Sequence, residues 1–398
     1  MVREEVFIVS AVRTAIGRYG GSLRLLTTGE IATFSIIEAM KRAKINPDQV
    51  DEVIMGEVRQ STESANAARV AALRAGIPDY VPAYTINRLC ASSMEAMYSG
   101  HLRVSTGEAN IIIAGGVENL SRSPHYLRNI RWGDGGVAQL VDSNVEGATA
   151  AQPTEIYGTN LGMGMTAENV AGKYNISRED QDEFSVRSHQ LASRAISEGK
   201  FKEEIVPVEV KFKKKVSMFD TDEHVRPDTT LEGLAKLKPA FKTGGTVTAG
   251  NSCGRNDGSA ALVLASGKAV EELGLTPLAR VLGYSAVGVD PRYMGIGPIP
   301  AVRKVLDKLN MKLEDIDLIE LNEAFASQSL ACVRELGLNI DITNVNGGAI
   351  ALGHPLGATG CRLVVSLLHE MKRRNSKLGL ATLCVGGGQG MATVIESI

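Results

Sequence analysis

The sequence has few of the features that indicate a metal centre or a disulfide framework. Its five cysteines are an odd number spread over 398 residues, and no two of them show the C-x-x-C spacing of a zinc or iron–sulfur site. The six histidines include no H-x-x-x-H pair. We therefore expect free thiols and no bound metal.

Long apolar runs and a strong charge of one sign are also absent. No apolar stretch approaches the roughly 18 residues needed to cross a bilayer, and the formal net charge is only −2. We therefore expect neither a membrane nor a nucleic acid as a partner. Residues 1–5 lead directly into the strand-like run 6–9 without an apolar leader, which predicts a cytoplasmic protein.

The pattern that is present is typical of an α/β fold. A chain of 398 residues exceeds the usual size of a single core, so two or three packed units are expected. Short apolar runs alternate with longer segments of helical period, which indicates buried strands between helices. The apolar runs are residues 6–9, 53–55, 111–115, 261–265, 318–321 and 380–385.

Two parts of the chain resemble each other in the order of their segments. Residues 50–54 and 111–116 in the first part correspond to residues 316–320 and 383–387 in the second. Duplication of one α/β unit explains this order, and chance similarity between two α/β units is the alternative.

The segment between these parts, from about residue 121 to 250, lacks their regular alternation of apolar runs and helical segments. It contains irregular stretches, polar helices and a lysine-rich run at 211–215, so it is interpreted as an excursion from the core. Ser177 and Asp180 form a capping-box pattern that predicts a helix start. The lysine run is more typical of a solvated face than of a phosphate site.

Cys90 stands at the start of a segment with helical period, in the sequence Asn87-Arg88-Leu89-Cys90-Ala91-Ser92. The backbone N–H groups and the positive end of a helix favour the thiolate, which is the form that attacks a carbonyl. A small buried hydrophobic residue is the alternative interpretation.

His354 lies in a glycine-rich segment, residues 346–362, with five glycines around it. Such a segment allows a ligand to approach the backbone closely, and an imidazole can polarise a carbonyl or hold a proton near neutral pH. A nucleotide-binding loop is the rival, but neither G-x-G-x-x-G after a strand nor a GK[ST] ending is present.

Cys384 lies near the end of one apolar run, and Asn322 directly follows another. Cys384 leads into the glycines 386–388, where exposed N–H groups can bind an oxyanion, although a tight turn alone would also use these glycines. Asn322 offers an amide that can hold a water or a carbonyl oxygen. Two cysteines, one histidine and one asparagine suit a reaction with a nucleophile, a base acting at carbon, and oxyanion donors.

Together these segments resemble the thiolase family. The family signatures around the acylated cysteine, the Gly-His-Pro histidine and the C-terminal Cys-x-Gly-Gly-Gly cysteine occur here in the same order, and the resemblance covers essentially the whole chain. Other matching segments are residues 12–17, 114–119, 166–169, 245–251 and 294–298.

The resemblance implies a fold of two similar βαβαβαββ halves that form five layers, α-β-α-β-α. On this basis we expect an N-terminal half at 1–270, which contains an inserted loop domain at 121–249, and a C-terminal half at 271–398. The family also implies a homotetramer built from two dimers.

The resemblance further implies an acyltransferase that uses coenzyme A to cleave a 3-oxoacyl-CoA into acetyl-CoA and a shortened acyl-CoA, or that runs the reverse condensation. Cys90 would accept the acyl group, and His354 would activate it and, with a water on Asn322, stabilise the enolate oxygen. Cys384 would exchange the proton at carbon, and the N–H groups of Cys90 and Gly386 would form the second oxyanion hole. Coenzyme A would be a co-substrate, with no permanently bound cofactor.

The resemblance also implies a set of substrate-binding residues. Arg226 would lie near the nucleotide end, Met163 and Met294 near the pantetheine or acyl pocket, and Phe325 beside them. Cys253 stands where many members have a serine that contacts the pantetheine arm.

Several positions bear on the subclass. Short-chain members typically have Tyr-His where this chain has Leu161-Gly162, and residues 127–133 and 222–227 resemble the broad, degradative members that act in fatty-acid β-oxidation. We therefore expect a 3-oxoacyl-CoA thiolase, with a short-chain acetoacetyl-CoA thiolase that condenses two acetyl-CoA molecules as the alternative.

Two other functions fit the sequence less well. A decarboxylating ketoacyl synthase would have two active-site histidines and no C-terminal base cysteine, so Cys384 argues against it. A thiolase-like subunit that only binds lipid or CoA conflicts with the presence of Cys90, His354 and Cys384.

Overall fold

All six predicted apolar runs form strands. The computed structural model describes residues 4–131, 138–159 and 161–398. Residues 1–3 and residues 132–133, which belong to sequence stretches used above, lie outside the described residues. The six runs lie in β1 (Val6–Thr14), β3 (Glu52–Gly56), β5 (Ile111–Asn119), β11 (Asn256–Ser266), β13 (Leu318–Leu321) and β14 (Leu378–Val385).

The first part of the chain has the order β1, α1, β3, α2, β4, α3, β5, β11, which is the predicted βαβαβαββ pattern. The insertion precedes its last strand. The remaining bounds are α1 (Thr28–Ala43), α2 (Ala67–Arg74), β4 (Ala83–Ile86), α3 (Ser92–Ser105) and the short β2 (Gly17–Arg18).

The second part repeats this order with one difference. Its third strand is reduced to a single parallel bridge between Ile319 and Thr343. The remaining bounds are β12 (Ala279–Gly288), α10 (Pro298–Leu309), α11 (Ala326–Leu336), α12 (Ala349–Leu352), α13 (Leu356–Arg374) and β15 (Gln389–Ser397).

Two aspartates show that the repeats are alike in detail. Asp51 accepts hydrogen bonds from the N–H groups of residues 110 and 111 at the start of β5, at 2.7 and 2.9 Å. Asp317 accepts from the N–H groups of residues 377 and 378 at the start of β14, both at 2.8 Å. The same side chain thus ties the same pair of strands in each part, as duplication predicts.

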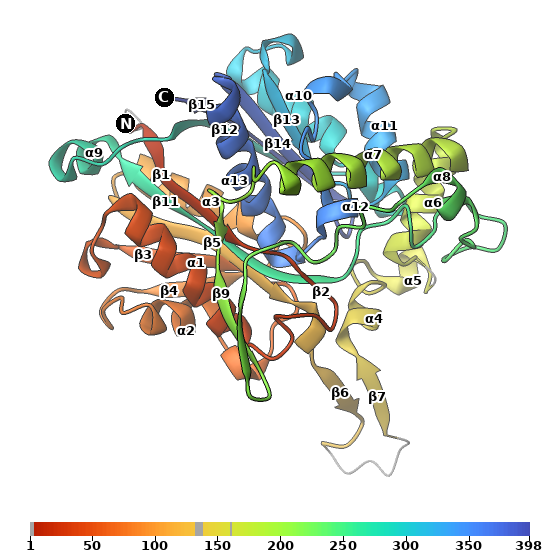
Figure 1. The fold of residues 1–398 in the computed structure, drawn as a ribbon, viewed down its shortest axis with the longest axis horizontal. Helices are drawn as coiled ribbons and strands as arrows, with labels where there is room; N and C mark the ends of the chain where they lie inside the picture. The colour runs from red at the N-terminus through yellow and green to blue at the C-terminus, as the bar shows by residue number, and fades with distance from the viewer. Residues whose placement is uncertain (1–3, 132–137, 160) are drawn as a thin grey trace.

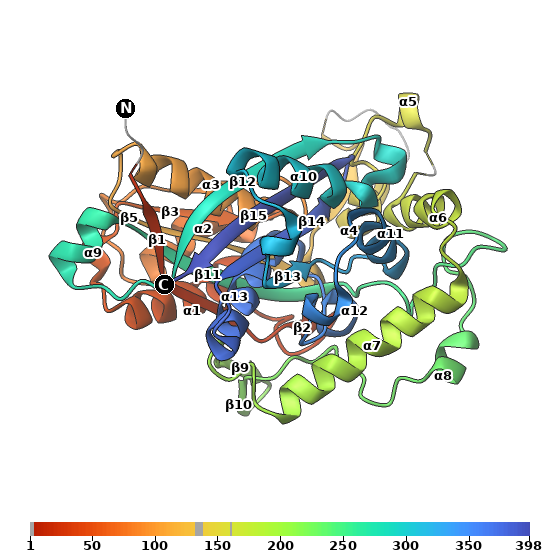
Figure 2. The same cartoon turned by 90° about the horizontal axis from the view of Figure 1, so that it is seen from above.

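The strands of both parts are joined in one sheet, with the order β13-β14-β15-β12-β1-β11-β5-β3-β4 and with β2 and β8 at its side. The parts meet where β1 pairs with β12, through Phe7 with Arg280 and Ile8 with Ala279. Figures 1 and 2 show the two groups of strands fanning away from this junction.

Alternation of buried side chains along the strands produces five layers. Val9 and Val12 of β1 pack with α1 and α2 on the outer face of the first part. Helices α3 and α13 lie between the two groups of strands, where Met97 and Leu367 share one core with β5, β11 and β14. Helices α10 and α11 cover the outer face of the second part, around Val305. The predicted α-β-α-β-α order is therefore present.

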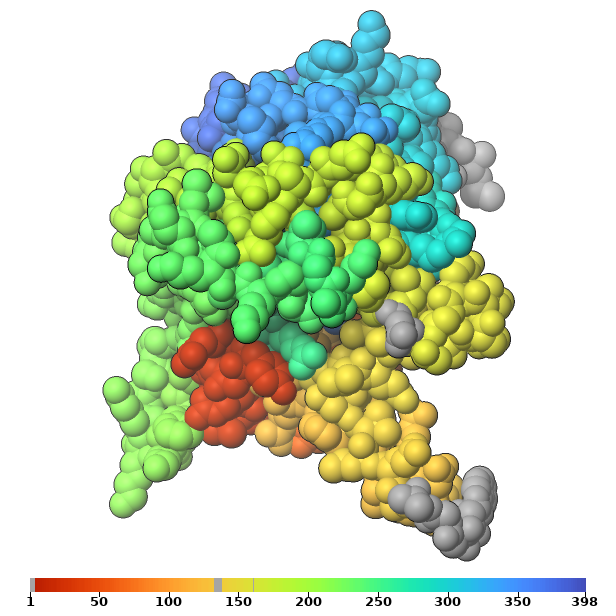
Figure 3. Space-filling view, turned by 90° about the vertical axis from the view of Figure 1, so that its right-hand side faces the viewer, coloured from red at the N-terminus to blue at the C-terminus, as the bar shows by residue number. Residues whose placement is uncertain are grey.

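The insertion covers one side of this core (Figure 3). The predicted helix start at Ser177 is confirmed, because Ser177 and Asp180 form a reciprocal capping box at α7. The lysine run lies at the exposed turn between β9 and β10, as expected for a solvated face. The elements of the insertion are β6 (His125–Arg128), β7 (Gln139–Asp142), α4 (Ser143–Gly147), α5 (Thr154–Tyr157), α6 (Met163–Lys173), α7 (Arg178–Ser197), β8 (Ile205–Val206), β9 (Val208–Phe212), β10 (Lys215–Phe219) and α8 (Leu231–Ala235).

A buried ion cluster fastens the insertion to the first strand. Arg13 of β1 donates from Nε to Glu204 at 2.6 Å and from its two terminal nitrogens to Asp222 at 2.7 and 2.9 Å. All three side chains are almost completely buried, so each charge depends on its partners.

The link between the two parts is α9 (Gly267–Leu273), which crosses the boundary predicted at residue 270. The division at that residue stays a prediction. Within the described ranges, none of the helices combines the length and the apolar character needed to cross a bilayer.

Candidate active site

Cys90 lies in a tight turn between β4 and α3. Leu89 adopts a left-handed conformation with φ of 47°, which is unusual for a residue with a branched side chain. The hydroxyl of Ser92 stabilises the turn, because it accepts from the N–H of Arg88 at 2.9 Å and donates to the carbonyl of Leu89 at 2.7 Å. The turn places Cys90 just before the N-terminus of α3, partly exposed to a cavity of about 800 Å³.

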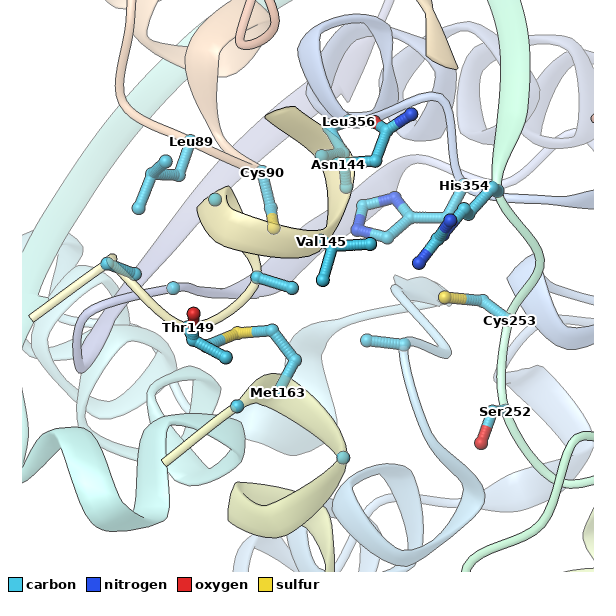
Figure 4. Close-up of a pocket in the computed structure, with 18 of the residues that line it drawn as sticks. Leu89, Cys90, Asn144, Val145, Thr149, Met163, Ser252, Cys253, His354 and Leu356 are labelled. Atoms are coloured by element: carbon cyan, nitrogen blue, oxygen red, sulfur yellow. The ribbon is translucent and has the colours of Figure 1, made fainter. Parts of the chain in front are cut away.

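His354 enters the same cavity from the turn between α12 and α13. Gly353 has φ of 105°, and a Cβ there would lie 2.4 Å from the side chain of Asn256. The absence of a side chain lets the backbone N–H of His354 donate to Asn256 Oδ1 at 3.0 Å. Figure 4 shows the thiol of Cys90 and the imidazole of His354 pointing into one space.

Thr359 determines which ring nitrogen of His354 holds the proton. Its hydroxyl donates to the carbonyl of Pro355 at 2.9 Å, so it must accept from Nδ1–H of His354, 2.7 Å away. The lone pair therefore lies on Nε2, which faces the side-chain nitrogen of Asn322 at 3.5 Å. An imidazole held in this way can accept a proton from the cavity side.

Asn322 follows the last residue of β13, and its own N–H donates to the carbonyl of Thr382 at 3.0 Å. Its side chain is fully buried, and Oδ1 has no hydrogen-bond partner among the described residues. An unpaired buried carbonyl oxygen is rare in folded proteins and calls for a donor such as water. The geometry is thus compatible with the water predicted at this position.

Cys384 and Gly386 lie at the end of β14. The N–H of Gly386 points to the sulfur of Cys90, and a Cβ on Gly386 would lie 3.1 Å from Leu89. Cys384 is 1% exposed and packs against Met294 and Phe325, which line the cavity. One strand end therefore supplies a hydrogen-bond donor to Cys90 and a second thiol close to it.

Burial dominates the electrostatics of these groups. It raises the pKa of Cys90, and the N–H groups of Gly386 and of Cys90 itself oppose that rise. Burial, followed by the charge of Arg362, lowers the pKa of His354 to about 3. Burial and then the neighbouring thiol of Cys90 raise the pKa of Cys384 well above its ordinary value. At neutral pH the site therefore holds two thiols and a neutral imidazole.

Four of the five predicted substrate-binding residues line the cavity. Met163, Met294 and Phe325 form an apolar part of its wall, and Cys253 lies near His354, on the other side of the space from Cys90 (Figure 4). The fifth, Arg226, is exposed and is not part of the cavity wall; its backbone N–H donates to Nδ1 of His189 at 3.2 Å. Their roles stay predictions.

Two residues of the site were not predicted from sequence. Thr359 lies within the glycine-rich segment, five residues after His354, so a hydroxyl one turn into the following helix was an available signal. Arg59 also lines the cavity, but nothing in the local sequence indicates that its side chain shares a cavity with Cys90. Among the residues with described positions, His, Cys, Asp and Glu side chains form no group of three that could hold a metal ion.

The geometry can be compared with known proteins. The family "Thiolase, N-terminal domain" matches residues 6–268, and "Thiolase, C-terminal domain" matches residues 275–397. The chain belongs to the thiolase family. It is therefore an acyltransferase that uses coenzyme A as a co-substrate, and the predicted family, fold class and reaction type are confirmed.

Three relatives show how extensive the similarity is. A beta-ketoadipyl-CoA thiolase of Pseudomonas knackmussii is 50% identical over 400 residues, which cover 99% of each chain. The crystal structure of a Bacillus anthracis acetyl-CoA acetyltransferase is 49% identical, covers 100% of both chains and has a TM-score of 0.96. The human mitochondrial 3-ketoacyl-CoA thiolase in complex with CoA is 44% identical, covers 100% of this chain and 99% of its own, and has a TM-score of 0.94.

Proposed function

We propose that this thiolase cleaves 3-oxoacyl-CoA substrates over a range of acyl lengths, through an acyl group on Cys90. The observation that supports this most strongly is the cavity of about 800 Å³ whose wall holds both Cys90 and His354. Gly162 also lines it, and a Cβ there would meet only Thr149 and a backbone oxygen, at 3.3 and 3.8 Å. The missing side chain at Gly162 leaves room for more than an acetyl group.

In the first half-reaction, Cys90 attacks the 3-oxo carbon while Nε2 of His354 takes the thiol proton. The N–H groups of Cys90 and Gly386 stabilise the oxyanion that forms on this carbon. The bond between C2 and C3 then breaks, and its electron pair leaves with acetyl-CoA as an enolate. Cys384 donates its proton to C2, which leaves an acyl thioester on Cys90 and a thiolate on Cys384.

In the second half-reaction, the thiol of coenzyme A gives its proton to the Cys384 thiolate and attacks the acyl carbon. The Cys90 sulfur leaves and recovers a proton from His354. The products are a shortened acyl-CoA and the enzyme in its starting state, so protons and electrons balance over the cycle. The reverse sequence is the condensation of two acyl-CoA molecules.

The pKa directions support these assignments. Because burial keeps Cys384 protonated at neutral pH, it can act as the acid toward an enolate. Because burial lowers the pKa of His354, the imidazole is neutral before the attack and free to accept the proton of Cys90. The unpaired Oδ1 of Asn322 supports a bound water whose second hydrogen faces the enolate oxygen.

A short-chain acetyl-CoA acetyltransferase is the second candidate. The B. anthracis enzyme with that name is about as similar to this chain as the relatives named beta-ketoadipyl-CoA thiolase and 3-ketoacyl-CoA thiolase, so overall identity does not choose between the two candidates. The choice depends on which acyl lengths enter the cavity.

The assembly, the division into halves and the location are further parts of this proposal. The β6–β7 segment projects from the body (Figure 1), and Leu127 and Leu140 on it are 51% and 72% exposed. Exposed apolar residues on a projecting segment support burial against other copies in a homotetramer. The proposal also includes a division of the chain into halves at 1–270 and 271–398, and a location in the cytoplasm.

The test is thiolysis of 3-oxoacyl-CoA substrates with four to sixteen carbons, measured by loss of the enolate absorbance. Cleavage of six-carbon and longer substrates supports the proposal. Cleavage of acetoacetyl-CoA alone favours the second candidate, and cleavage of none contradicts both.

A further inference from the structure

Arg59 is a cation in the wall of the active-site cavity, and the proposed reaction does not use it. It lies three residues after β3, and its backbone is fixed because the N–H groups of Val58 and Arg59 donate to Glu118 at 3.2 and 2.9 Å. Its guanidinium packs against α4, where a Cβ on Gly147 would lie 2.4 Å from its central carbon. The side chain is half-buried and lines the same cavity as Cys90.

The guanidinium has no anionic partner among the residues that the structure describes. It forms no salt bridge there, and its Nε is enclosed without a hydrogen-bond partner. The contrast within this chain is clear, since the buried Arg13 is paired with both Glu204 and Asp222. A guanidinium has five N–H donors, so one that lines a cavity without a partner favours an incoming anion.

Glu118 is the anion that could make Arg59 purely structural. Its carboxylate is already held by three backbone N–H groups, those of Val58, Arg59 and Gly357, at 2.8 to 3.2 Å. Burial raises the pKa of Glu118 and of Cys90, and the charge of Arg59 opposes that rise in both groups. Backbone N–H groups therefore satisfy the Glu118 carboxylate, and the guanidinium of Arg59 remains available to a ligand in the cavity.

Apolar side chains line part of the cavity that contains Arg59. Val58, Leu89, Leu120 and Val145 line the same cavity, and Leu89 and Val145 lie around the space that Cys90 faces (Figure 4). A ligand that fits has an alkyl segment that ends in an anionic group. The phosphates of coenzyme A do not meet this description, because the pantetheine arm separates them from the thioester at Cys90.

We propose that Arg59 is a specificity-determining residue for 3-oxoacyl groups that end in a carboxylate. This inference rests on the proposed function and adds the substrate class to it. The methylene groups pack on the apolar wall, and the terminal carboxylate accepts hydrogen bonds from the guanidinium in the geometry that arginine offers to carboxylates.

The test compares two matched pairs of substrates on the full-length enzyme. 3-Oxoadipyl-CoA and 3-oxohexanoyl-CoA have the same six-carbon chain and differ only in a terminal carboxylate or methyl group; 3-oxosuberyl-CoA and 3-oxooctanoyl-CoA extend the comparison to eight carbons. The measured quantity is the ratio of kcat/KM for the acid to that for its uncharged partner, in wild type, Arg59→Leu and Arg59→Lys.

We expect Arg59→Leu to lower this ratio by at least about tenfold in one of the pairs, as expected for loss of a charge-assisted hydrogen bond. Arg59→Lys should give an intermediate ratio, because it keeps the charge and loses the planar fork. An equal effect of Arg59→Leu on both members of each pair, or cleavage of only the uncharged substrates by wild type, overturns the inference and leaves the thiolase function intact. Cleavage of none of the four substrates overturns the proposed function and this inference together.

Discussion

Substitution of Thr359 by valine isolates the orientation of His354 from the rest of the site. Valine has nearly the shape of threonine, so the cavity and the packing of α13 change little, but the acceptor 2.7 Å from Nδ1 disappears. The buried Nδ1–H is then unpaired, which costs about 1–3 kcal/mol. The imidazole can avoid this cost by moving its proton to Nε2, and that tautomer cannot accept the proton of Cys90.

We therefore expect Thr359→Val to lower kcat/KM for thiolysis by about 10- to 100-fold, which corresponds to that cost at about 1.4 kcal/mol per tenfold change. Thr359→Ser keeps the hydroxyl and should stay near wild type. The assay is the initial rate of 3-oxoacyl-CoA cleavage, with thermal unfolding to check that each variant is folded. Wild-type activity in Thr359→Val, or equal damage in both variants, would refute the assignment of the Nδ1–H tautomer.

Three further predictions concern stability, chain length and pH. Arg13→Met should destabilise the fold by about 3–5 kcal/mol, because it leaves Glu204 and Asp222 buried without their cation; chemical denaturation measures this, and a loss below about 1 kcal/mol would contradict it. Gly162→Leu should lower kcat/KM for long 3-oxoacyl-CoA substrates at least about tenfold more than for acetoacetyl-CoA, because the new side chain enters the cavity; uniform loss across the chain-length series would speak against this. Burial lowers the pKa of His189 to about 4, so its contribution to stability is complete above the unfolded-state value of about 6.5 and is lost as the pH falls from there to about 4. The unfolding temperature should therefore drop over this window, and less so in His189→Asn.

The parts of the fold that follow from local sequence were predictable. Each apolar run became a strand because it is buried on both faces, and Cys90 and Asn322 were placed correctly beside secondary structure because strand and helix boundaries are local signals. The core formed by α3 and α13 was not visible in the pattern. It depends on the close approach of two helices that are more than 250 residues apart in the sequence. The helices are so close that a Cβ on Gly360 would collide with Met94.

The site was predictable to a similar extent. The reactive side chains could be identified from their residue types and from the glycine-rich segments around them. Arg59 could not be identified in this way, because its place depends on α4 of the insertion packing against its guanidinium, and sequence spacing does not encode that contact. The burial of Cys384 against Met294 and Phe325 likewise depends on tertiary packing.

The central claim is that the acyl group passes through Cys90, and trapping the intermediate tests it most directly. The enzyme would be mixed with a 3-oxoacyl-CoA in the absence of free coenzyme A, quenched in acid, digested and analysed by mass spectrometry. The account predicts an acyl group on the peptide that contains Cys90, none in Cys90→Ser, and a rate in that variant at least about a hundredfold lower, as expected for loss of a nucleophile. Near-normal turnover of Cys90→Ser, or an acyl group found on Cys384 or Cys253 instead, would contradict it.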